Sequence, residues 1–524
     1  MPKVKLYDTT LRDGSQGEGI SYSVLDKSRI ARELDSLGIH YIEGGWPGSN
    51  PKDMEFFVQM AKKPLKNSTL VAFSMTRRPN IKASDDQNIK AILKSKAKSV
   101  AIVGKTWDLH VSDVLKVELD ENIRMIEDTV SFLVSKGLEV FYDAEHFFDA
   151  YKHNKEYTFK CLAAAELAGA KAICLCDTNG GMLTSELARI VREIRPLVKV
   201  GLGIHCHNDC GVAVANSLTA VEAGCDIVQG TINGYGERCG NADLIPIIAN
   251  LMLKMKISCL GEDKLKELTK VSHFVSEMAN MKQRSDQPFV GDSSFAHKGG
   301  MHINAVVKNP KSYEHIDPSL VGNHRRILVS ELGGKTGIML RAKNLEFDLA
   351  KEDAKTKKIL KLIQDLEHKG YHFEAAEASF ELLMKKALKK YNKFFELEGF
   401  RVVIEKVSNK KITSEAIIRV KVKGVKEHTA ADGDGPVNAL DNALRKALKD
   451  FYPSLSKMHL SDFKVRVLDE KDGTAAKVRV LIQSQDETDS WSTVGVSENI
   501  IEASWQALVD SVEYKLLKDT KKQP

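Results

Sequence analysis

Two histidines separated by one residue are the first side chains in this sequence whose spacing predicts chemistry. His205 and His207 lie in a strand-like run, and residues two apart on a strand project to the same face. Asp13 and Asn241 place a carboxylate and an amide oxygen just beyond two other strand-like runs. Such a set with open positions suits a divalent ion that also binds substrate, and ligand type alone does not separate Mg, Mn, Zn or Co.

The segments that must position these ligands alternate between strand-like and helical patterns up to about residue 250. Eight short apolar or β-branched runs recur at intervals of roughly 30 residues, with helical patterns between them, which is typical of repeated βα units. Eight such units predict a TIM barrel with its active site at the carboxyl ends of the strands. The predicted strands are residues 4–7, 41–43, 70–73, 100–103, 140–142, 172–175, 200–204 and 227–230.

Polar residues follow these runs at the predicted active-site end. Strands 7, 8 and 1 are neighbours in a closed ring of eight, so Asp13, Asn241 and the two histidines are expected to converge on one cation. Arg12 adjoins Asp13 and is expected either to stabilise developing negative charge on a substrate oxygen or to form a salt bridge within the barrel. Other polar residues at the same end are Glu43, Glu145, Asp177 and Thr178.

Composition limits the classes of function that the chain supports. Its 524 residues suggest two or three domains, with 43% hydrophobic and 28% charged residues, as in globular proteins. The net charge of +6 comes from 77 basic and 71 acidic residues, which argues against a nucleic-acid partner. No signal-like segment and no long apolar run appears, so we expect a cytoplasmic protein without a membrane partner.

Eight cysteines lie between Cys161 and Cys259, and we assign them no function. Their placement is not that of a disulfide framework. A zinc site built from four of them is the alternative, but these pairs lack the usual two-residue spacer, so we expect small buried side chains. The four are Cys174, Cys176, Cys206 and Cys210.

The pattern changes after the barrel, and the sequence predicts three domains. They are a catalytic barrel at 1–270, a connector at 271–398 that contributes to the active site, and an α+β regulatory domain at 399–524. Strand-like runs at 400–404, 416–422, 463–467 and 476–482 precede helices, and glycine segments at 433–438 and 495–499 predict two turns and a weak internal duplication.

At its motifs the sequence resembles the acyltransferases that condense acetyl-CoA with a 2-oxo acid, namely isopropylmalate, homocitrate and citramalate synthases. The motifs are YDTTLRDGSQ at 7–16, HCHND at 205–209, GERCGNA at 236–242 and FAHKGGMH at 295–302. The resemblance spans nearly the whole chain and implies a metal-dependent TIM barrel, a homodimer and a C-terminal allosteric domain.

Two segments are most similar to the citramalate synthase branch, which uses pyruvate. They are GGWPGSNPKD at 44–53 and GMHINA at 300–305, where Asn304 stands at a position usually occupied by aspartate in the other branches. The resemblance implies condensation of acetyl-CoA with pyruvate, followed by thioester hydrolysis, with isoleucine as the feedback inhibitor. The alternative is an isopropylmalate synthase that uses 2-oxoisovalerate.

Further site residues are implied only by the resemblance. It assigns the substrate carboxylate to Thr178, with a helix cap as the alternative, and acyl-CoA binding to Gln16, with a structural hydrogen bond as the alternative. It points to His302 as the base, with Tyr313 and Glu145 as partners, in a connector that folds over the barrel mouth. The sequence alone does not choose His302 over three other histidines, which are His297, His315 and His324.

Two other classes of function remain to be compared. Related lyases and carboxyltransferases share the barrel, but the lyases generally lack such a C-terminal domain. Carboxyltransferases need a lysine at a strand end, which Lys105 could supply, yet their remaining motifs are absent. The second of these classes is a ligand sensor with an inactive barrel. It is disfavoured by the intact residues Arg12, Asp13, His205, His207 and Asn241.

Overall fold

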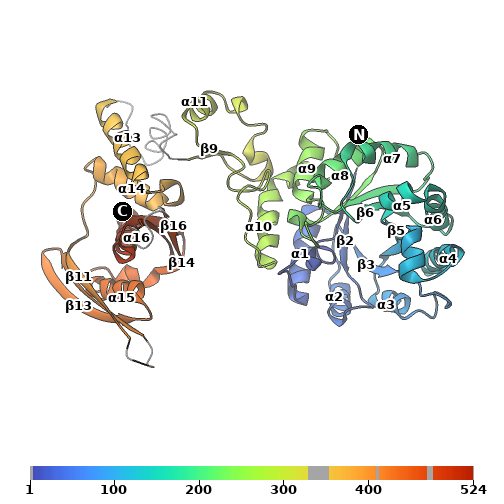
Figure 1. Ribbon diagram of the computed structural model, residues 1–524, viewed down its shortest axis with the longest axis horizontal. Helices are drawn as coiled ribbons and strands as arrows, with labels where there is room; N and C mark the ends of the chain where they lie inside the picture. Colours follow the sequence, from blue (N-terminus) through green and yellow to red (C-terminus); the bar gives the residue numbers. More distant parts are fainter. Residues whose placement is uncertain (1–3, 329–352, 407, 409–411, 469–475, 523–524) are drawn as a thin grey trace. The chain divides into compact units, whose positions relative to one another are not determined.

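The computed structural model describes residues 4–328, 353–406, 408, 412–468 and 476–522. The chain divides into two compact units (Figure 1). The first contains the described residues of Met1–Phe295 together with Ile316–Arg325. The second contains the described residues of Ala296–His315 and of Arg326–Pro524.

The first unit is built on a closed barrel of eight parallel strands, as predicted. All eight predicted strands are present, and β1 pairs with both β2 and β8, so the ring is complete. The strands are β1 (Lys5–Asp8), β2 (Tyr41–Gly45), β3 (Thr69–Met75), β4 (Ser99–Lys105), β5 (Glu139–Glu145), β6 (Ala172–Asp177), β7 (Gly201–Cys206) and β8 (Ile227–Gly230).

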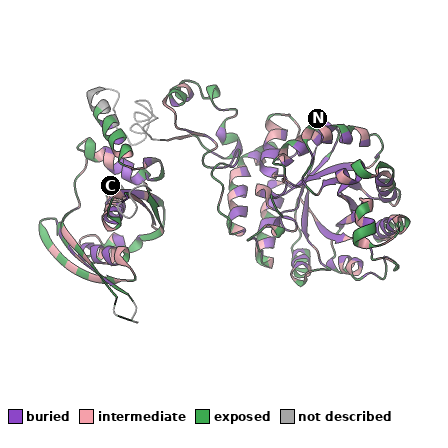
Figure 2. Ribbon diagram, in the orientation of Figure 1, coloured by how far each residue is buried: buried purple, intermediate pink, exposed green. Residues whose placement is uncertain are grey.

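Helices surround the barrel and bury the outer faces of its strands (Figures 1 and 2). The first helix, α1, begins with a capping box between Ser23 and Asp26 and ends where Gly38 adopts a left-handed φ of 99°. The helices are α1 (Val24–Leu37), α2 (Pro51–Lys62), α3 (Gln87–Ser95), α4 (Leu119–Ser135), α5 (Phe147–His153), α6 (Lys155–Leu167), α7 (Thr184–Ile194), α8 (Ala213–Glu222), α9 (Leu244–Leu253) and α10 (Leu268–Met278).

The barrel interior is filled by side chains rather than being a pore. Tyr7, Tyr41 and Phe141 contact one another edge to face or tilted, with ring centroids 4.8–5.9 Å apart. These three rings are buried, and they belong to one apolar cluster with Val71 and Ala101 from neighbouring strands. This packed layer leaves the carboxyl ends of the strands as the place where polar groups can face a cavity.

The second unit begins with a short parallel pair, β9 (Ala296–His297) and β10 (Arg326–Ile327). Between them lie α11 (Gly300–Lys308) and a 3₁₀ turn, η5 (Pro310–Ser312). His297 Nε2 lies 3.1 Å from a carboxylate oxygen of Glu314, and both side chains are buried. This contact gives His297 a structural partner inside the second unit.

Two similar halves make up the C-terminal part of the second unit. Each half is a three-stranded antiparallel sheet followed by a helix. The first half is β11 (Phe395–Glu405), β12 (Thr413–Val422), β13 (Val425–Gly433) and α15 (Pro436–Leu448). The second half is β14 (His459–Val467), β15 (Val478–Gln485), β16 (Ser490–Ser497) and α16 (Ile500–Lys522).

The two halves also repeat a specific contact between sheet and helix. Thr429 Oγ1 on β13 donates to the Ala443 carbonyl on α15 at 2.9 Å, and Thr493 Oγ1 on β16 donates to the Ala507 carbonyl on α16 at 2.8 Å. Both pairs are fourteen residues apart in sequence. The repetition agrees with the internal duplication that the sequence predicts.

The sequence does not predict the third strand of each half, because the glycine of that strand is typical of a turn. Gly433 ends β13, and Gly495 lies within β16, where it pairs with Val480. The turn prediction at Gly495 is wrong, and its φ is not left-handed. Glycine is required there by close packing, since an added Cβ would lie 2.0 Å from the Ala503 carbonyl oxygen of α16.

Two helices that precede the C-terminal sheets pack within the same unit. They are α13 (Asp353–His368) and α14 (Glu377–Ala387). Phe380 and Met384 of α14 share a buried cluster with Ile363 of α13 and Val494 of β16. Helix α14 ends at Ala387, and the first strand of the C-terminal sheets, β11, begins at Phe395.

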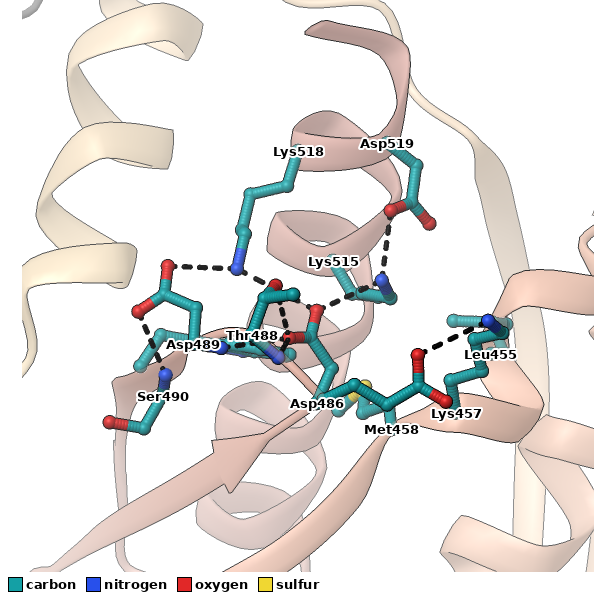
Figure 3. A network of polar contacts seen from close by, with 12 residues as sticks. Leu455, Lys457, Met458, Asp486, Thr488, Asp489, Ser490, Lys515, Lys518 and Asp519 are labelled. Carbon is teal, nitrogen blue, oxygen red and sulfur yellow. Dashed lines mark hydrogen bonds and ion pairs between the residues drawn. The ribbon is translucent and has the colours of Figure 1, made fainter. Parts of the chain in front are cut away.

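A network of buried charges joins the turn between β15 and β16 to helix α16 (Figure 3). Asp486 accepts hydrogen bonds from the Thr488 and Asp489 amides, and its other oxygen accepts from Lys515 Nζ at 3.0 Å. Lys515 also donates to Asp519 at 2.8 Å. The Asp486 and Lys515 side chains are more than nine-tenths buried, so the turn is held by ionic contacts that are shielded from water.

In the described part of the chain, no helix combines the length and apolar character needed to span a membrane.

Candidate active site

The four predicted metal ligands lie together at the carboxyl end of the barrel. His205 is on β7, His207 and Asn241 pair with each other just beyond β7 and β8, and Asp13 follows β1. Asp13 Oδ2 lies 3.4 Å from His205 Nε2 and 4.0 Å from His207 Nε2. The three ligand atoms are all within 4.8 Å of one another, and all four side chains are buried. This spacing allows one cation to contact all three residues.

The orientation of His205 is set by hydrogen bonds behind it. His205 Nδ1 lies 3.1 Å from Gln229 Oε1, and Gln229 Nε2 donates to Asp143 Oδ1 at 3.0 Å. Because the amide oxygen can only accept, it selects the tautomer with a proton on Nδ1. The lone pair of Nε2 is then directed toward Asp13, which is the arrangement that a metal-binding histidine requires.

Asn241 provides an independent test of whether these residues fit a cation. Its Nδ2 donates to the Tyr235 carbonyl at 3.1 Å, which orients the amide. Its Oδ1 is buried and has no hydrogen-bond partner among the described residues. A buried oxygen without a partner is costly in a folded protein, and a bound cation removes that cost. The residues present therefore fit a divalent metal ion.

The protonation states of the ligands also suit a cation. Burial lowers the pKa of His205, and it lowers the pKa of His207 to about 4, with His205 adding to the effect. Burial alone would raise the pKa of Asp13, but Arg12 and the two histidines outweigh it and hold that pKa below its ordinary value. Neutral imidazoles and an ionised carboxylate are the forms that bind metals.

Arg12 extends into the same cavity and is held on two sides. Its Nε donates to Glu43 Oε1 at 2.5 Å, and its guanidinium carbon lies 3.9 Å from the centroid of the Phe73 ring. Burial disfavours the charge, but Glu43 and Asp13 keep the pKa of Arg12 above its ordinary value. A salt bridge and a site role are therefore compatible, because the Glu43 contact uses Nε and fixes the rest of the guanidinium beside Asp13.

One cavity of about 330 Å³ is lined by most of the barrel site residues predicted from the sequence, with the exception of Asn241. Its lining includes Arg12, Asp13, Gln16, Glu145 and Thr178, together with both histidines. Its apolar lining includes Trp46, Phe73, Met75 and Val103. A small ligand with a carboxylate and a short apolar group fits such a lining.

The structure bears on two alternatives that the sequence raises, a helix cap at Thr178 and a carboxyltransferase role for Lys105. Thr178 does not cap the following helix, because α7 begins only at Thr184. Its Oγ1 accepts at 2.9 Å from the amide of His146, the residue that precedes α5. The hydroxyl proton of Thr178 is then available for another acceptor. Glu145 forms an ion pair with Lys105, so that lysine is already engaged by a carboxylate.

His302 and Tyr313 belong to the second compact unit, whereas the barrel site residues belong to the first. Their rings stack with centroids 4.2 Å apart, and both side chains are exposed. His302 is on α11, and Tyr313 follows η5. The structure thus brings these two residues together within their own unit.

Sequence reasoning missed several polar residues of the cavity. Gln229, Asp143, Cys176 and Arg238 line it in addition to the predicted set. The register of the barrel contains the missing signal, because Gln229 is paired with His205 across β7 and β8. A search for polar residues opposite each predicted ligand would have found Gln229.

Three protein-family models match successive segments of this chain, and known proteins are similar to it over nearly its whole length. The HMGL-like family model matches residues 3–275, the homocitrate synthase post-HMGL domain-like model matches 289–370, and the LeuA allosteric (dimerisation) domain matches 374–516. The (R)-citramalate synthase of Geobacter sulfurreducens is 54% identical, with 99% of this chain and 98% of that protein covered.

Two further relatives separate the branches of the family. The (R)-citramalate synthase of Aquifex aeolicus is 52% identical, with 99% of this chain and 98% of that protein covered. The 2-isopropylmalate synthase of Methanocaldococcus jannaschii is 31% identical, with 99% of this chain and 96% of that protein covered. The chain belongs to the HMGL-like family and, within it, to the (R)-citramalate synthases.

Proposed function

We propose that this protein condenses acetyl-CoA with pyruvate to give citramalate and coenzyme A. Full-length identity of 54% to an (R)-citramalate synthase is the observation that carries the proposal. The cavity supports it, since a carboxylate, two histidines, an arginine and a threonine face one small volume beside a short apolar wall. Citramalate is then an intermediate of amino-acid biosynthesis, and we assign this reaction to the pathway that makes isoleucine.

In the proposed site, Asp13, His205, His207 and Asn241 hold a divalent ion of the group Mg, Mn, Zn and Co. When bound, the ion supplies Lewis-acid polarisation of the keto group of pyruvate. Arg12 places a fixed positive charge beside the keto oxygen, where negative charge develops. Thr178 donates its hydroxyl proton to the substrate carboxylate, and Gln16 contributes to binding the acyl-CoA.

The condensation needs a base that removes a proton from the acetyl methyl group. His302 is proposed for this role, with Tyr313 and Glu145 as its partners. The methyl carbon then bonds to the keto carbon, and the carbonyl electron pair moves to oxygen, which is protonated to a hydroxyl group. Water finally cleaves the thioester, leaving a carboxylate and the free thiol of coenzyme A.

The C-terminal domain is proposed to bind isoleucine and to support a homodimer. The matching family model is described as allosteric and as a dimerisation domain, which supports both assignments. We also propose a catalytic barrel at 1–270 and a connector after it. The regulatory unit is proposed to begin before α13 rather than at 399, because α13 and α14 share a buried cluster with β16.

A thiol-release assay with acetyl-CoA and a panel of 2-oxo acids tests the proposal directly. Pyruvate is expected to give a much higher kcat/KM than 2-oxoisovalerate, with a measurable side reaction for 2-oxobutyrate. An apolar wall discriminates by only about 1–3 kcal/mol per methylene group, so the side reaction is not abolished. Exhaustive chelation is expected to stop thiol release, and added divalent metal to restore it. A preference for 2-oxoisovalerate would transfer the chain to the isopropylmalate branch.

A further inference from the structure

A second group of metal-binding side chains lies inside the barrel next to the first. Asp143 is on β5, and Cys174 and Cys176 are on β6. One carboxylate oxygen and the two sulfur atoms all lie within 4.8 Å of one another. The three residues are only 3–6% exposed.

This group differs from the cysteine set that the sequence suggests. Cys206 adjoins both His205 and His207, so strand alternation turns it to the opposite face, where it belongs to the apolar core. Cys210 is exposed. The carboxylate of Asp143 takes the place of these two thiols, and it comes from a neighbouring strand.

Strand register explains why these three side chains meet. Asp143 on β5 is directly paired with Cys174 on β6. Cys176 lies two residues after Cys174 on β6, so all three side chains project to the same face of the sheet. Gly203 is paired with Cys174 on the other side. A Cβ at Gly203 would lie 3.3 Å from Cys174 Sγ, so glycine keeps the space beside this sulfur open.

Two of the three residues of this group line the active-site cavity. Asp143 and Cys176 both line the cavity of about 330 Å³ that also contains Asp13 and His205. Asp143 Oδ1 accepts from Gln229, which engages one of the two carboxylate oxygens. A cation that enters the cavity therefore meets a second ligand set beyond the histidines.

We propose that Asp143, Cys174 and Cys176 form a separate binding site for a thiophilic divalent cation such as Zn²⁺ or Cd²⁺. Two sulfur donors and one oxygen favour soft cations over Mg²⁺ or Ca²⁺. Tetrahedral zinc with two thiolates requires sulfur atoms about 3.8 Å apart, which is compatible with the 4.8 Å limit on the present spacing. Binding releases one proton from each thiol to solvent and forms two metal–sulfur bonds, with no change of oxidation state.

Cadmium is the probe, because a Cd–thiolate bond absorbs in the ultraviolet whereas Cd²⁺ bound to histidine and carboxylate lacks this band. The full-length protein is used in excess Mg²⁺, with the exposed thiols removed by Cys210→Ser and Cys239→Ser. Titration with Cd²⁺ is expected to produce a sulfur-to-cadmium band that saturates at one equivalent. Cys174→Ala and Cys176→Ala are each expected to abolish at least half of the band.

Two further variants keep the test decisive. Asp143→Asn retains both sulfurs and is nearly isosteric, and it is expected to weaken Cd²⁺ binding about 10-fold or more while the band persists at saturation. Cys161→Ala removes a buried thiol of α6 and is expected to leave the titration unchanged. The proposal is overturned if the parent protein shows no such band. It is also overturned if Cys161→Ala loses as much of the band as Cys174→Ala and Cys176→Ala do.

Discussion

Gln229 is a single residue that connects two ligand sets in the barrel. Its oxygen contacts Nδ1 of His205, and its nitrogen donates to Asp143. Because an amide has distinct donor and acceptor ends, this pair of contacts determines which nitrogen of His205 carries a proton. The metal-binding capacity of His205 thus depends on a neighbour that is not itself a ligand.

Gln229→Ala is expected to weaken divalent metal binding by about 10- to 100-fold, since the tautomer and ring orientation of His205 are no longer fixed. Equilibrium dialysis with Mn²⁺ measures this directly, without reference to turnover. Gln59→Ala on the exposed face of α2 is the matched control. Equal Mn²⁺ affinity in the Gln229 variant and the control would show that Gln229 does not position His205.

The sequence predicts the four candidate ligands but not the residues behind them. Asp13, His205, His207 and Asn241 stand out because polar residues at strand ends are unexpected in a purely structural barrel. Asp143 and Gln229 lie within buried strands, where a polar residue has no distinctive pattern until its partner across the sheet is known. Their roles depend on register and on the direction of side chains, and neither is encoded in a local spacing.

At the scale of helices and strands, the sequence predicts the barrel better than the C-terminal sheets. Strands buried on both faces are nearly continuous apolar runs, so the eight barrel strands are recognisable. Strands β13 and β16 are not continuous apolar runs, and they end at or contain a glycine, which also marks turns. Local pattern does not distinguish a turn glycine from one required by a packed helix.

Gly495→Ala is expected to destabilise the second unit by about 1–3 kcal/mol, because overpacking forces β16 and α16 apart. The added Cβ would lie 2.0 Å from the Ala503 carbonyl oxygen, and that atom belongs to the helix backbone. Gly399→Ala on β11 is the control, since no atom lies within 4 Å of its added Cβ. Urea unfolding of both full-length variants tests the difference, and equal stabilities would contradict the packing argument.

Asp486→Asn is expected to lower the free energy of unfolding by about 2 kcal/mol at neutral pH, because a buried charged acceptor of Lys515 is lost. Burial raises the pKa of Asp486, but hydrogen bonds from Thr488 and Lys515 outweigh it, and the folded-state pKa lies below the ordinary value. The contribution is therefore complete above the unfolded-state pKa and is lost as pH falls through the folded-state pKa.

Unfolding of the Asp486 variant at pH 7 and in the acid range tests that dependence. The difference from the unmodified protein is expected to shrink as the pH falls below about 4. Asp450→Asn, an exposed substitution at the end of the first half, is expected to change stability by less than about 0.5 kcal/mol at either pH. A difference that grows toward low pH would contradict the assigned direction.

At the scale of the whole molecule, removal of the C-terminal domain is expected to abolish inhibition by isoleucine. The chain is best ended at residue 352, because a cut at 399 would leave Phe380 and Met384 without the strand they pack against. Thiol release with and without isoleucine compares the shortened and full-length proteins. If the shortened protein is active and isoleucine still inhibits it to the same extent, the C-terminal domain is not the isoleucine-binding domain.

Binding measurements on the full-length protein provide the control if the shortened chain is inactive. Allosteric coupling is reciprocal for affinities, so pyruvate must change the affinity for isoleucine by the same factor by which isoleucine changes the affinity for pyruvate. Calorimetric titration of each ligand with and without the other measures both factors. Unequal factors would show that the two ligands do not act through one coupled equilibrium.

Closure of the barrel by pairing of β1 with β8 has a consequence for the newly synthesised chain. Asp13 is made early, whereas His205, His207 and Asn241 follow roughly 200 residues later, which is a delay of tens of seconds at about 5–20 residues per second. During that interval the ribosome-bound chain contains the carboxylate without its imidazole partners. The four candidate ligands are therefore all present only after β8 and Asn241 have been made, when the ring can close.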